Sequence, residues 1–535
     1  MIRIYNTLNQ EKEELLPLKP PHIGMYVCGP TTYNFIHLGN ARPLVVFDTV
    51  RRYLKYRGYD VTYVQNFTDV DDKIINRARE AGEDPLKLSA RYIDEYFLDA
   101  DSLGVQRADV HPRVSQHIPD IIAAVEGLVK GGHAYPIDGD VYFRISSFPE
   151  YGKLSHRDQE EMLAGARVDI DDRKESPMDF ALWKAAKPGE PAWDSPWGPG
   201  RPGWHIECSV MSTKYLGQTL DIHGGGFDLI FPHHENEVAQ AEALSGQPFV
   251  NYWMHNGFIT VNKEKMSKSL GNFFIVRDIL TKYPPAVVRF FLLATHYRSP
   301  LDFDDSRLEE AGRALARLTT CRGLMKEYLS SAVVNHKTKI AETELLNEIA
   351  NARLEFIEAM DDDFNTARAL GHLFDICRLV NGYMAAHPNK KSEELTVVNQ
   401  ISETFEELYT LLGLDDCRQT AENSERVQLL LGVLINMRNR ARTSKNYDLA
   451  DRLRDQVVTW GIVLEDAAGT TRFKAEKFPA DEAVAEYLVS LRTELKRGKQ
   501  YKDADYLREL LQGAGVIVED TREGARWRFE GIVSS

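Results

Sequence analysis

The sequence predicts an α/β domain built on a parallel sheet, followed by an α-helical bundle and two copies of a small α/β module. Three observations predict this order. A strand, a helix and a second strand follow one another within residues 24–68. Helical periodicity continues with little interruption after residue 305. Near the C-terminus, one pattern occurs twice without a gap.

The first strand, helix and strand form a βαβ unit. Residues 24–28 (GMYVC) are a short apolar run that the segment GPTT ends. Residues 37–56 place apolar side chains at helical spacing, and Gly58 ends that helix. β-branched and aromatic residues then predict a strand over residues 60–68. Because a helix joins the two strands, they are expected to run parallel.

The α/β domain is expected to span residues 1–304. Helical periodicity fills about residues 71–130. The segment from about residue 138 to 204 is rich in Pro, Gly and Trp, which predicts an insertion with long loops. Residues 305–420 are predicted to form the helical bundle.

The C-terminal repeat is defined by a constant offset of 54 residues. Identical residues at this offset include Arg438 and Arg492, Lys445 and Lys499, Tyr447 and Tyr501, and Gly461 and Gly515. Each copy reads as a helical hairpin, a glycine turn and a strand. Residues 425–475 and 476–535 are therefore predicted to be duplicated modules.

Composition bounds the class of protein. A chain of 535 residues is too long for one core. The net charge of −15 argues against a nucleic-acid partner, although phosphate contacts need only a local basic patch. The sequence lacks a long apolar run and the pattern of a signal peptide, so no membrane span is expected. Five scattered cysteines favour a location in the reducing cytoplasm over a disulfide framework. The protein is also expected to be a monomer.

Two short motifs combine features that bind phosphate. Residues 263–272 (KEKMSKSLGN) place three lysines in a loop, where mobile positive charge suits nucleotidyl transfer; a solvated surface loop is the alternative. Residues 37–40 (HLGN) follow a strand and begin a helix, so His37 and the backbone N–H groups lie where an anion binds. Gly39 lets a flat ring or a phosphate approach the backbone closely.

The two motifs together resemble the signature of class I aminoacyl-tRNA synthetases, and their context resembles the cysteinyl-tRNA synthetase family. The segments that carry the resemblance occur in this order: MYVCGPTTYNFIHLGNAR, NFTDVDDKIINRA, SPMDFALWK, GRPGWHIECSVM, DIHGGGFDLIFPHHENEVAQ and KMSKSLGNF. The resemblance covers residues 1–472. It implies a Rossmann-type catalytic domain with a connective insertion and the activity of a cysteine–tRNA ligase.

The resemblance also implies the substrates and two chemical steps. The carboxylate of L-cysteine attacks the α-phosphate of ATP, which Mg²⁺ accompanies, and the terminal adenosine of tRNA-Cys then attacks the activated carbonyl. Catalysis rests on orientation and charge stabilisation, for which we expect His37, Lys265 and Lys268. The residues expected to bind ATP are His37, Gly39, Asn40 and Lys268. Asn40 stands where the family signature often has histidine; its amide donates a hydrogen bond but carries no charge.

Four further residues are candidate metal ligands. Cys28 ends the first strand, Cys208 lies in WHIECS, and His233 and Glu237 are spaced to share one helix face. Such a set suits tetrahedral zinc, and the family resemblance implies one zinc ion there; His234 is the adjacent alternative. Zinc is thiophilic and is expected to bind the substrate thiolate, whereas a steric pocket separates near-isosteres by only ~1–3 kcal/mol.

Other roles rest on the resemblance or on local charge. Residues implied to position the amino acid are Thr68, Trp204 and His223. Packing of Trp204 within its loop and a simple glycine turn at HGGGFD remain open alternatives. The basic residues expected to contact tRNA are Arg438, Arg440, Arg442 and Lys445 in the first copy and Arg492, Lys496 and Lys499 in the second. Trp527 and Arg528 are expected to stack on a base, against the alternative of a core aromatic.

Two alternative functions and one additional activity stay open at this stage. One is a ligase that adenylates cysteine and transfers it to an amino sugar; the basic C-terminal repeat argues against it. Another is a tRNA-binding paralogue without activity, against which the intact KMSKS motif argues. Some family members are credited with forming cysteine persulfide by means of pyridoxal phosphate held on lysines, and Lys73 and Lys268 match those positions.

Overall fold

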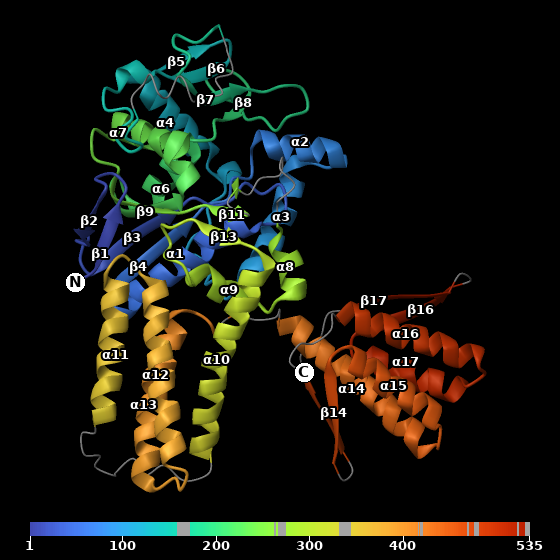
Figure 1. Ribbon diagram of the computed structural model, residues 1–535. Helices are drawn as coiled ribbons and strands as arrows, with labels where there is room; N and C mark the ends of the chain where they lie inside the picture. Colours follow the sequence, from blue (N-terminus) through green and yellow to red (C-terminus); the bar gives the residue numbers. More distant parts are fainter. Residues whose placement is uncertain are drawn as a thin grey trace. The chain divides into compact units, whose positions relative to one another are not determined.

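The computed structural model describes residues 1–157, 172–261, 264–265, 274–330, 344–415, 417, 421–467, 470–475, 481–521 and 524–529. The chain divides into two compact units, Met1–Cys417 and Arg418–Ser535 (Figure 1). None of the described helices combines the length and the apolar content that a membrane span requires.

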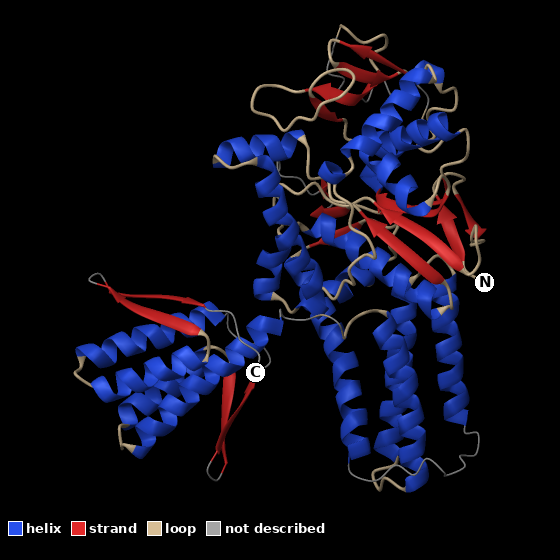
Figure 2. Cartoon of the chain, turned by 180° about the vertical axis from the view of Figure 1, so that it is seen from behind, coloured by secondary structure: helices blue, strands red, loops and turns tan. Residues whose placement is uncertain are grey.

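The centre of the first unit is a parallel sheet with the strand order β10-β9-β3-β4. Its strands are β10 (Val250–Asn256), β9 (Leu220–Gly226), β3 (His22–Val27) and β4 (Asp60–Gln65). Helix α1 (Leu38–Tyr56) connects β3 to β4. The predicted βαβ unit and the parallel sheet are therefore confirmed. Helices flank the sheet on both faces (Figure 2), which buries its apolar strands.

The region predicted to be helical contains three α-helices: α2 (Asp72–Ala81), α3 (Pro85–Ser102) and α4 (Ile118–Lys130). The expected insertion contains more regular structure than its composition predicts. Four strands form an antiparallel sheet in the order β5-β6-β7-β8. They are β5 (Ala134–Ile137), β6 (Asp140–Phe143), β7 (Phe180–Ala185) and β8 (Gly200–Pro202). Trp183 is buried in the core beneath this sheet, so part of the Trp-rich composition reflects packing.

The second half of the α/β fold returns the chain to the central sheet. Helix α6 (Ile206–Leu216) leads into β9, and α7 (Glu235–Ser245) leads into β10. A hairpin of β1 (Arg3–Asn6) and β2 (Glu11–Glu14) contacts the edge strand β10. The remaining elements are β11 (Ile259–Val261), β12 (Glu264–Lys265), β13 (Leu301–Phe303), α8 (Val276–Lys282) and α9 (Pro285–Leu293).

Four long helices form the predicted bundle. They are α10 (Asp305–Ser330), α11 (Glu344–Asp361), α12 (Thr366–Ala386) and α13 (Ser392–Leu411). Their buried side chains belong to the same apolar cluster as α1 and β3. The bundle and the α/β fold therefore share one core, and the expected division at residue 304 remains a prediction.

The second unit confirms the repeat in the structure. The first copy contains α14 (Ala421–Thr443), α15 (Tyr447–Thr459), β14 (Ile462–Ala467) and β15 (Thr470–Ala475). The second copy contains α16 (Asp481–Arg497), α17 (Tyr501–Gly513), β16 (Val516–Thr521) and β17 (Gly524–Phe529). At the sequence offset of 54, the two copies coincide from the end of the first helix through the second helix and both strands, whereas α14 begins earlier than α16 does. The two copies also share one apolar core.

Candidate metal and nucleotide site

A pocket lies at the carboxyl ends of β3 and β9, where parallel sheets commonly bind ligands. Its wall is formed by the turn between β3 and α1, by Thr68 and Lys73, by residues at the start of α6 and by residues that precede α7. Residues far apart in the sequence therefore meet at one edge of the sheet, as a βαβ fold requires.

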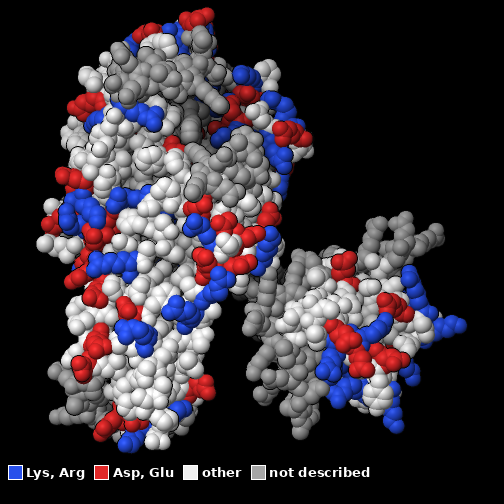
Figure 3. All heavy atoms as spheres, viewed as in Figure 1, with Lys and Arg blue, Asp and Glu red and all other residues white. Residues whose placement is uncertain are grey.

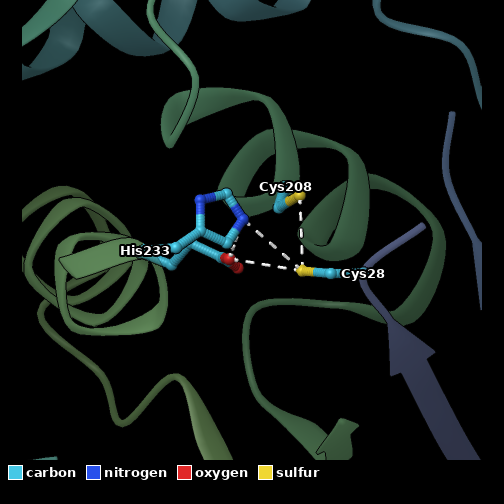
Figure 4. Close-up of side chains that lie close together, drawn as sticks. Cys28, Cys208 and His233 are labelled. Carbon is cyan, nitrogen blue, oxygen red and sulfur yellow. Dashed lines mark hydrogen bonds and ion pairs between the residues drawn. The ribbon is translucent and has the colours of Figure 1, made fainter. Parts of the chain in front are cut away.

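Four of the predicted metal ligands converge beside this pocket (Figure 4). The Cys28 sulfur lies 3.6 Å from the Cys208 sulfur, 3.6 Å from Nε2 of His233 and 3.5 Å from Oε1 of Glu237. Nε2 of His233 lies 3.0 Å from the same Glu237 oxygen. These four atoms come from the residue after β3, from α6, from the turn before α7 and from α7 itself, so only the folded chain assembles them.

The donor set fits a tetrahedral ion. Zinc–sulfur bonds of about 2.3 Å and zinc–nitrogen or zinc–oxygen bonds of about 2.0–2.2 Å place ligand atoms about 3.3–3.8 Å apart. The separations in the cluster lie close to that range. Two sulfurs, an imidazole nitrogen and a carboxylate oxygen are also the donor types that zinc prefers.

A second group of side chains offers a competing set. Cys28, Glu237, His223 and His234 also place one ligand atom each within 4.8 Å of one another. His234 places Nε2 3.4 Å from the Cys28 sulfur, with Nδ1 held by His255, but neither His223 nor His234 lines the pocket. The sulfur of Cys208 and the ring of His233 do line it, so an ion held by the first set is reachable by a bound amino acid.

The residues of the cluster shift one another's pKa values in opposite directions. Burial raises the pKa of Glu237, but the rings of His223 and His233 outweigh burial and lower that pKa to about 2. Burial lowers the pKa of His233, yet Glu237 and Cys208 outweigh it and raise the pKa to about 10. The hydrogen bond from Cys28 lowers the pKa of Cys208 to about 6, whereas burial raises that of Cys28. A bound cation would displace these protons, because metal ligands bind deprotonated.

Two histidines support the ligands from outside the set. Nε2 of His223 lies 2.8 Å from Oε2 of Glu237, and Nδ1 of His205 lies 2.9 Å from Nδ1 of His233. Such contacts orient ligands and tune their basicity. The position of His223 behind Glu237 favours an orienting role over the expected contact with substrate. The sequence analysis did not single out His205, although its position between Trp204 and Cys208 could have indicated a role near the metal ligands.

The HLGN motif forms the nucleotide side of the pocket. His37, Gly39 and Asn40 all line it, and His37 is the N-cap of α1. Oδ1 of Asn40 accepts a hydrogen bond from the backbone N–H of His37 at 3.3 Å. The asparagine at the fourth place of the signature thus stabilises the first turn of the helix, which is where the anion-binding N–H groups lie.

Two predicted substrate residues line the pocket. Oγ1 of Thr68 donates to Oε2 of the buried Glu207 at 2.9 Å, a partner that the sequence did not indicate. Trp204 is 37% exposed, and its ring stacks on His233 with centroids 4.4 Å apart. The indole therefore covers a candidate metal ligand from the pocket side, although it also packs within its loop.

The lysines of the KMSKS motif lie largely outside the described residues. Lys268 falls outside them, and Lys265 is described only as a backbone position in β12, paired with Thr260. Lys73 lines the pocket, and its ammonium lies 5.9 Å from the ring centroid of Tyr33. A role for Lys73 and Lys268 with pyridoxal phosphate remains a prediction.

The structure corrects the predicted RNA patches. The prediction that Arg438 and Arg492 contact RNA is wrong, because both side chains are buried in the C-terminal unit. Trp527 packs against the shared core, so the alternative of a core aromatic is confirmed. Arg528 stands opposite Ile517 in the hairpin of β16 and β17.

Comparison with known sequences and structures shows which class of proteins shares this fold. The family model described as the class I tRNA synthetase (C) catalytic domain matches residues 14–313, and a DALR domain model matches residues 355–414. A methionyl-tRNA synthetase of Mycobacterium tuberculosis in complex with methionyl-adenylate superposes with a TM-score of 0.58 at 15% identity, over 75% of this chain and 93% of that one. The fold and the match to the catalytic-domain model show that this chain is a class I aminoacyl-tRNA synthetase.

Curated relatives narrow this class. A cysteine–tRNA ligase of Pelotomaculum thermopropionicum is 57% identical over 486 residues, which cover 89% of this chain and 100% of the relative. The ligase of Carboxydothermus hydrogenoformans is 57% identical over 88% of this chain and 100% of its own length. That of Geobacillus thermodenitrificans is 50% identical over 88% and 99%. The chain belongs to the cysteine–tRNA ligase family.

Proposed function

We propose that this member of the cysteine–tRNA ligase family selects L-cysteine through a zinc ion held by Cys28, Cys208, His233 and Glu237, and joins it to tRNA-Cys at the expense of ATP. The observation that supports this selection most directly is the convergence of two sulfurs, an imidazole and a carboxylate, of which the sulfur and imidazole residues line the pocket. Membership of the cysteine–tRNA ligase family favours tRNA over an amino sugar as the acceptor.

The ion would supply a thiophilic Lewis acid, which distinguishes a thiol from a hydroxyl by bond chemistry rather than by size. The chain's own residues supply the rest of the selection. His205 holds the ring of His233 in place, and His223 holds the carboxylate of Glu237. Trp204 stacks on His233 and shields that side of the site from water. Thr68, fixed by Glu207, presents its hydroxyl at the pocket wall.

The adenylation step uses the other side of the pocket. The N-terminal N–H groups of α1 and the ring of His37 bind the phosphates of ATP, with Mg²⁺ as the companion of the nucleotide. Lys265 and Lys268 supply mobile positive charge as the α-phosphate is attacked. Gly39 and Asn40 bring the backbone close to the nucleotide. Transfer of cysteine to the tRNA 3′ end completes the reaction.

The C-terminal unit is assigned to tRNA. Arg442 and Lys445 are exposed at the turn between α14 and α15, where they can contact phosphate. The chain is expected to act as a monomer in the cytoplasm, where thiols stay reduced. Light scattering of the purified protein checks the oligomeric state.

Two matched serine variants test the metal selection. Cys208→Ser removes one sulfur ligand, whereas Cys417→Ser changes a thiol outside the cluster. We expect Cys208→Ser to lose bound zinc, measured by elemental analysis, and to lower cysteine-dependent ATP–pyrophosphate exchange by at least about a hundredfold. Cys417→Ser should retain both. Zinc-free parent protein that still prefers cysteine to serine by orders of magnitude would contradict the proposal.

A further inference from the structure

The second copy of the C-terminal module has no assigned role. Relatives that match along 99–100% of their own length cover 88–89% of this chain, so about a tenth of the chain has no counterpart in them. That share corresponds in size to one copy of the repeat. The question is what surface the additional copy offers.

The two copies pack against each other about an approximate two-fold axis. The guanidinium of Arg440 lies over the ring of Tyr506 at 4.3 Å. At the repeat offset these positions become Glu494 and Arg452, and these two side chains form an ion pair at 3.1 Å. A contact between positions i and j thus recurs between j and i, which is the mark of an isologous interface. Each copy therefore covers the same face of the other.

The turn between the two helices of each copy remains outside that interface. Lys445 and Lys499 take the same left-handed backbone conformation, with φ of 61° and 60°. The next exposed aromatics are also equivalent: Tyr447 is 60% exposed and Tyr501 is 57% exposed. A large exposed aromatic ring at one corner is unremarkable. Its recurrence at the equivalent corner, beside a lysine in the same conformation, indicates two copies of one surface.

The two corners differ in charge, and the second is the more basic. Residues 496–502 read KRGKQYK, with four cations and no acid. In the first copy, Arg440 is engaged by Asp503 at 2.8 Å in the interface between the copies. Figure 3 shows Lys and Arg side chains gathered along the edge of this unit, where Figure 1 places the turns after α14 and α16. The unit thus concentrates positive charge there in a chain whose net charge is −15.

An exposed tyrosine amid lysines has a specific chemistry. Aromatic rings stack on unpaired bases, and lysines contact the adjoining phosphates, so an exposed tyrosine flanked by lysines suits single-stranded RNA. We propose that the turn Lys496–Lys502 is a second RNA-binding site, in which an unpaired base stacks on Tyr501 and phosphates contact Lys499 and Lys502. The proposal rests on the proposed function, which places RNA on this unit, and the tests below separate the two.

Variants of the full chain test the stacking. Binding of tRNA-Cys and of an unstructured oligoribonucleotide is measured by fluorescence anisotropy. Tyr501→Ala should weaken the binding of at least one of these RNAs about tenfold, whereas Tyr501→Phe keeps the ring and should bind as the parent does. Cysteine-dependent ATP–pyrophosphate exchange should be unchanged in both variants, because the adenylation pocket lies in the other unit.

A charge-matched pair tests the lysines. The double variant Lys499→Gly and Lys502→Ala should reduce the slope of log affinity against log salt by about 1.4, the value for two contacts on single-stranded RNA. Arg454→Ala with Arg508→Ala removes the same charge from equivalent exposed places on α15 and α17 and should leave the slope unchanged. Glycine at position 499 suits the left-handed backbone there.

The outcomes separate the two proposals. Weaker binding of the oligoribonucleotide with unchanged tRNA-Cys binding supports the site and assigns it to another RNA. If Tyr501→Ala and the double lysine variant bind both RNAs as the parent does, while Tyr447→Ala weakens tRNA-Cys, the second site is refuted and the proposed function stands. Failure of the parent protein to charge tRNA-Cys would instead overturn the proposed function.

Discussion

At the scale of single residues, the metal cluster shows how one carboxylate is assigned its task. Oε1 of Glu237 faces Cys28 and His233, whereas Oε2 faces His223. The second oxygen is therefore occupied by a ring that is itself buried, which fixes the first oxygen toward the donor set. Helical spacing places Glu237 near His233, but it does not show which oxygen points where.

A half-buried histidine outside the site is expected to make stability depend on pH. His111 places Nδ1 3.0 Å from the carbonyl of Gln65, and its Nε2 accepts the N–H of Ala108 at 3.1 Å. Burial, assisted by the charges of Arg107 and Arg51, lowers the pKa of His111 to about 4. The neutral ring serves both hydrogen bonds, and protonation at Nε2 removes the acceptor.

This predicts an acid-sensitive contribution to stability. Because the unfolded pKa is about 6.5, the contribution is complete above that pH and is lost as pH falls toward 4. At pH 5 the loss is about 2 kcal/mol. The Tm of the parent should fall between pH 7 and pH 5 by roughly 2–4 °C more than that of His111→Gln, measured by calorimetry. Equal decreases in the two proteins would show that His111 does not titrate in this range.

At the scale of elements, a buried arginine ties the end of the bundle to the α/β fold. Nε of Arg289 in α9 donates to the carbonyl of Leu412 at 2.7 Å, and Nη1 donates to that of Leu103 at 3.0 Å. The same guanidinium pairs with Asp48 of α1. Three segments distant in the sequence thus converge on one side chain, which compensates the burial of its charge.

The glycine beside this arginine is predicted to be irreplaceable. Gly413 has φ of +66°, and a Cβ there would lie 2.4 Å from the guanidinium of Arg289. Gly413→Ala should therefore lower the Tm, since the backbone alone costs about 1–2 kcal/mol and Arg289 must also move. Gly371→Ala in α12 is the matched change, because that position is open. It should raise the stability by about 0.5–1 kcal/mol. Thermal unfolding of both variants checks the opposite signs.

The shared core of the repeat matters in the same way. Leu434 and Met437 of α14 belong to the same buried cluster as Leu488 and Leu491 of α16. Each helical hairpin alone would expose one apolar face to water. The duplicated modules are therefore one structural element in energetic terms, although the sequence presents them as two.

At the scale of the whole molecule, each compact unit has its own apolar core. The adenylation pocket and the candidate metal cluster lie entirely within the first unit. This predicts that adenylation and tRNA recognition respond separately to changes in the C-terminal unit.

Truncation after residue 475 tests this separation. The shortened chain should keep cysteine-dependent ATP–pyrophosphate exchange, since the first unit is intact. The first copy loses half of the shared core, so we expect its helices to become sensitive to proteolysis and tRNA charging to fall. Loss of exchange on truncation would show that the units depend on each other. Point variants such as Tyr501→Ala are therefore better tests of RNA binding than truncation is.

The sequence by itself determined the features that are written along the chain. Apolar spacing defined β3, α1 and β4, and the constant offset of the repeat matched the second helix and the hairpin of each copy. Motif order identified Cys28, Cys208, His233 and Glu237, which the structure brings together. Periodicity and residue identity are local properties, and a sequence displays them directly.

Only the tertiary structure decided which side chains are covered. It buried Arg438 and Arg492, packed Trp527 against the shared core and placed His223 behind Glu237. It also formed an antiparallel sheet within the insertion, where composition indicated loops. The physical reason is that burial and pairing depend on the partner surface, which comes from distant parts of the chain. A basic residue reads the same in a sequence whether water or another helix faces it.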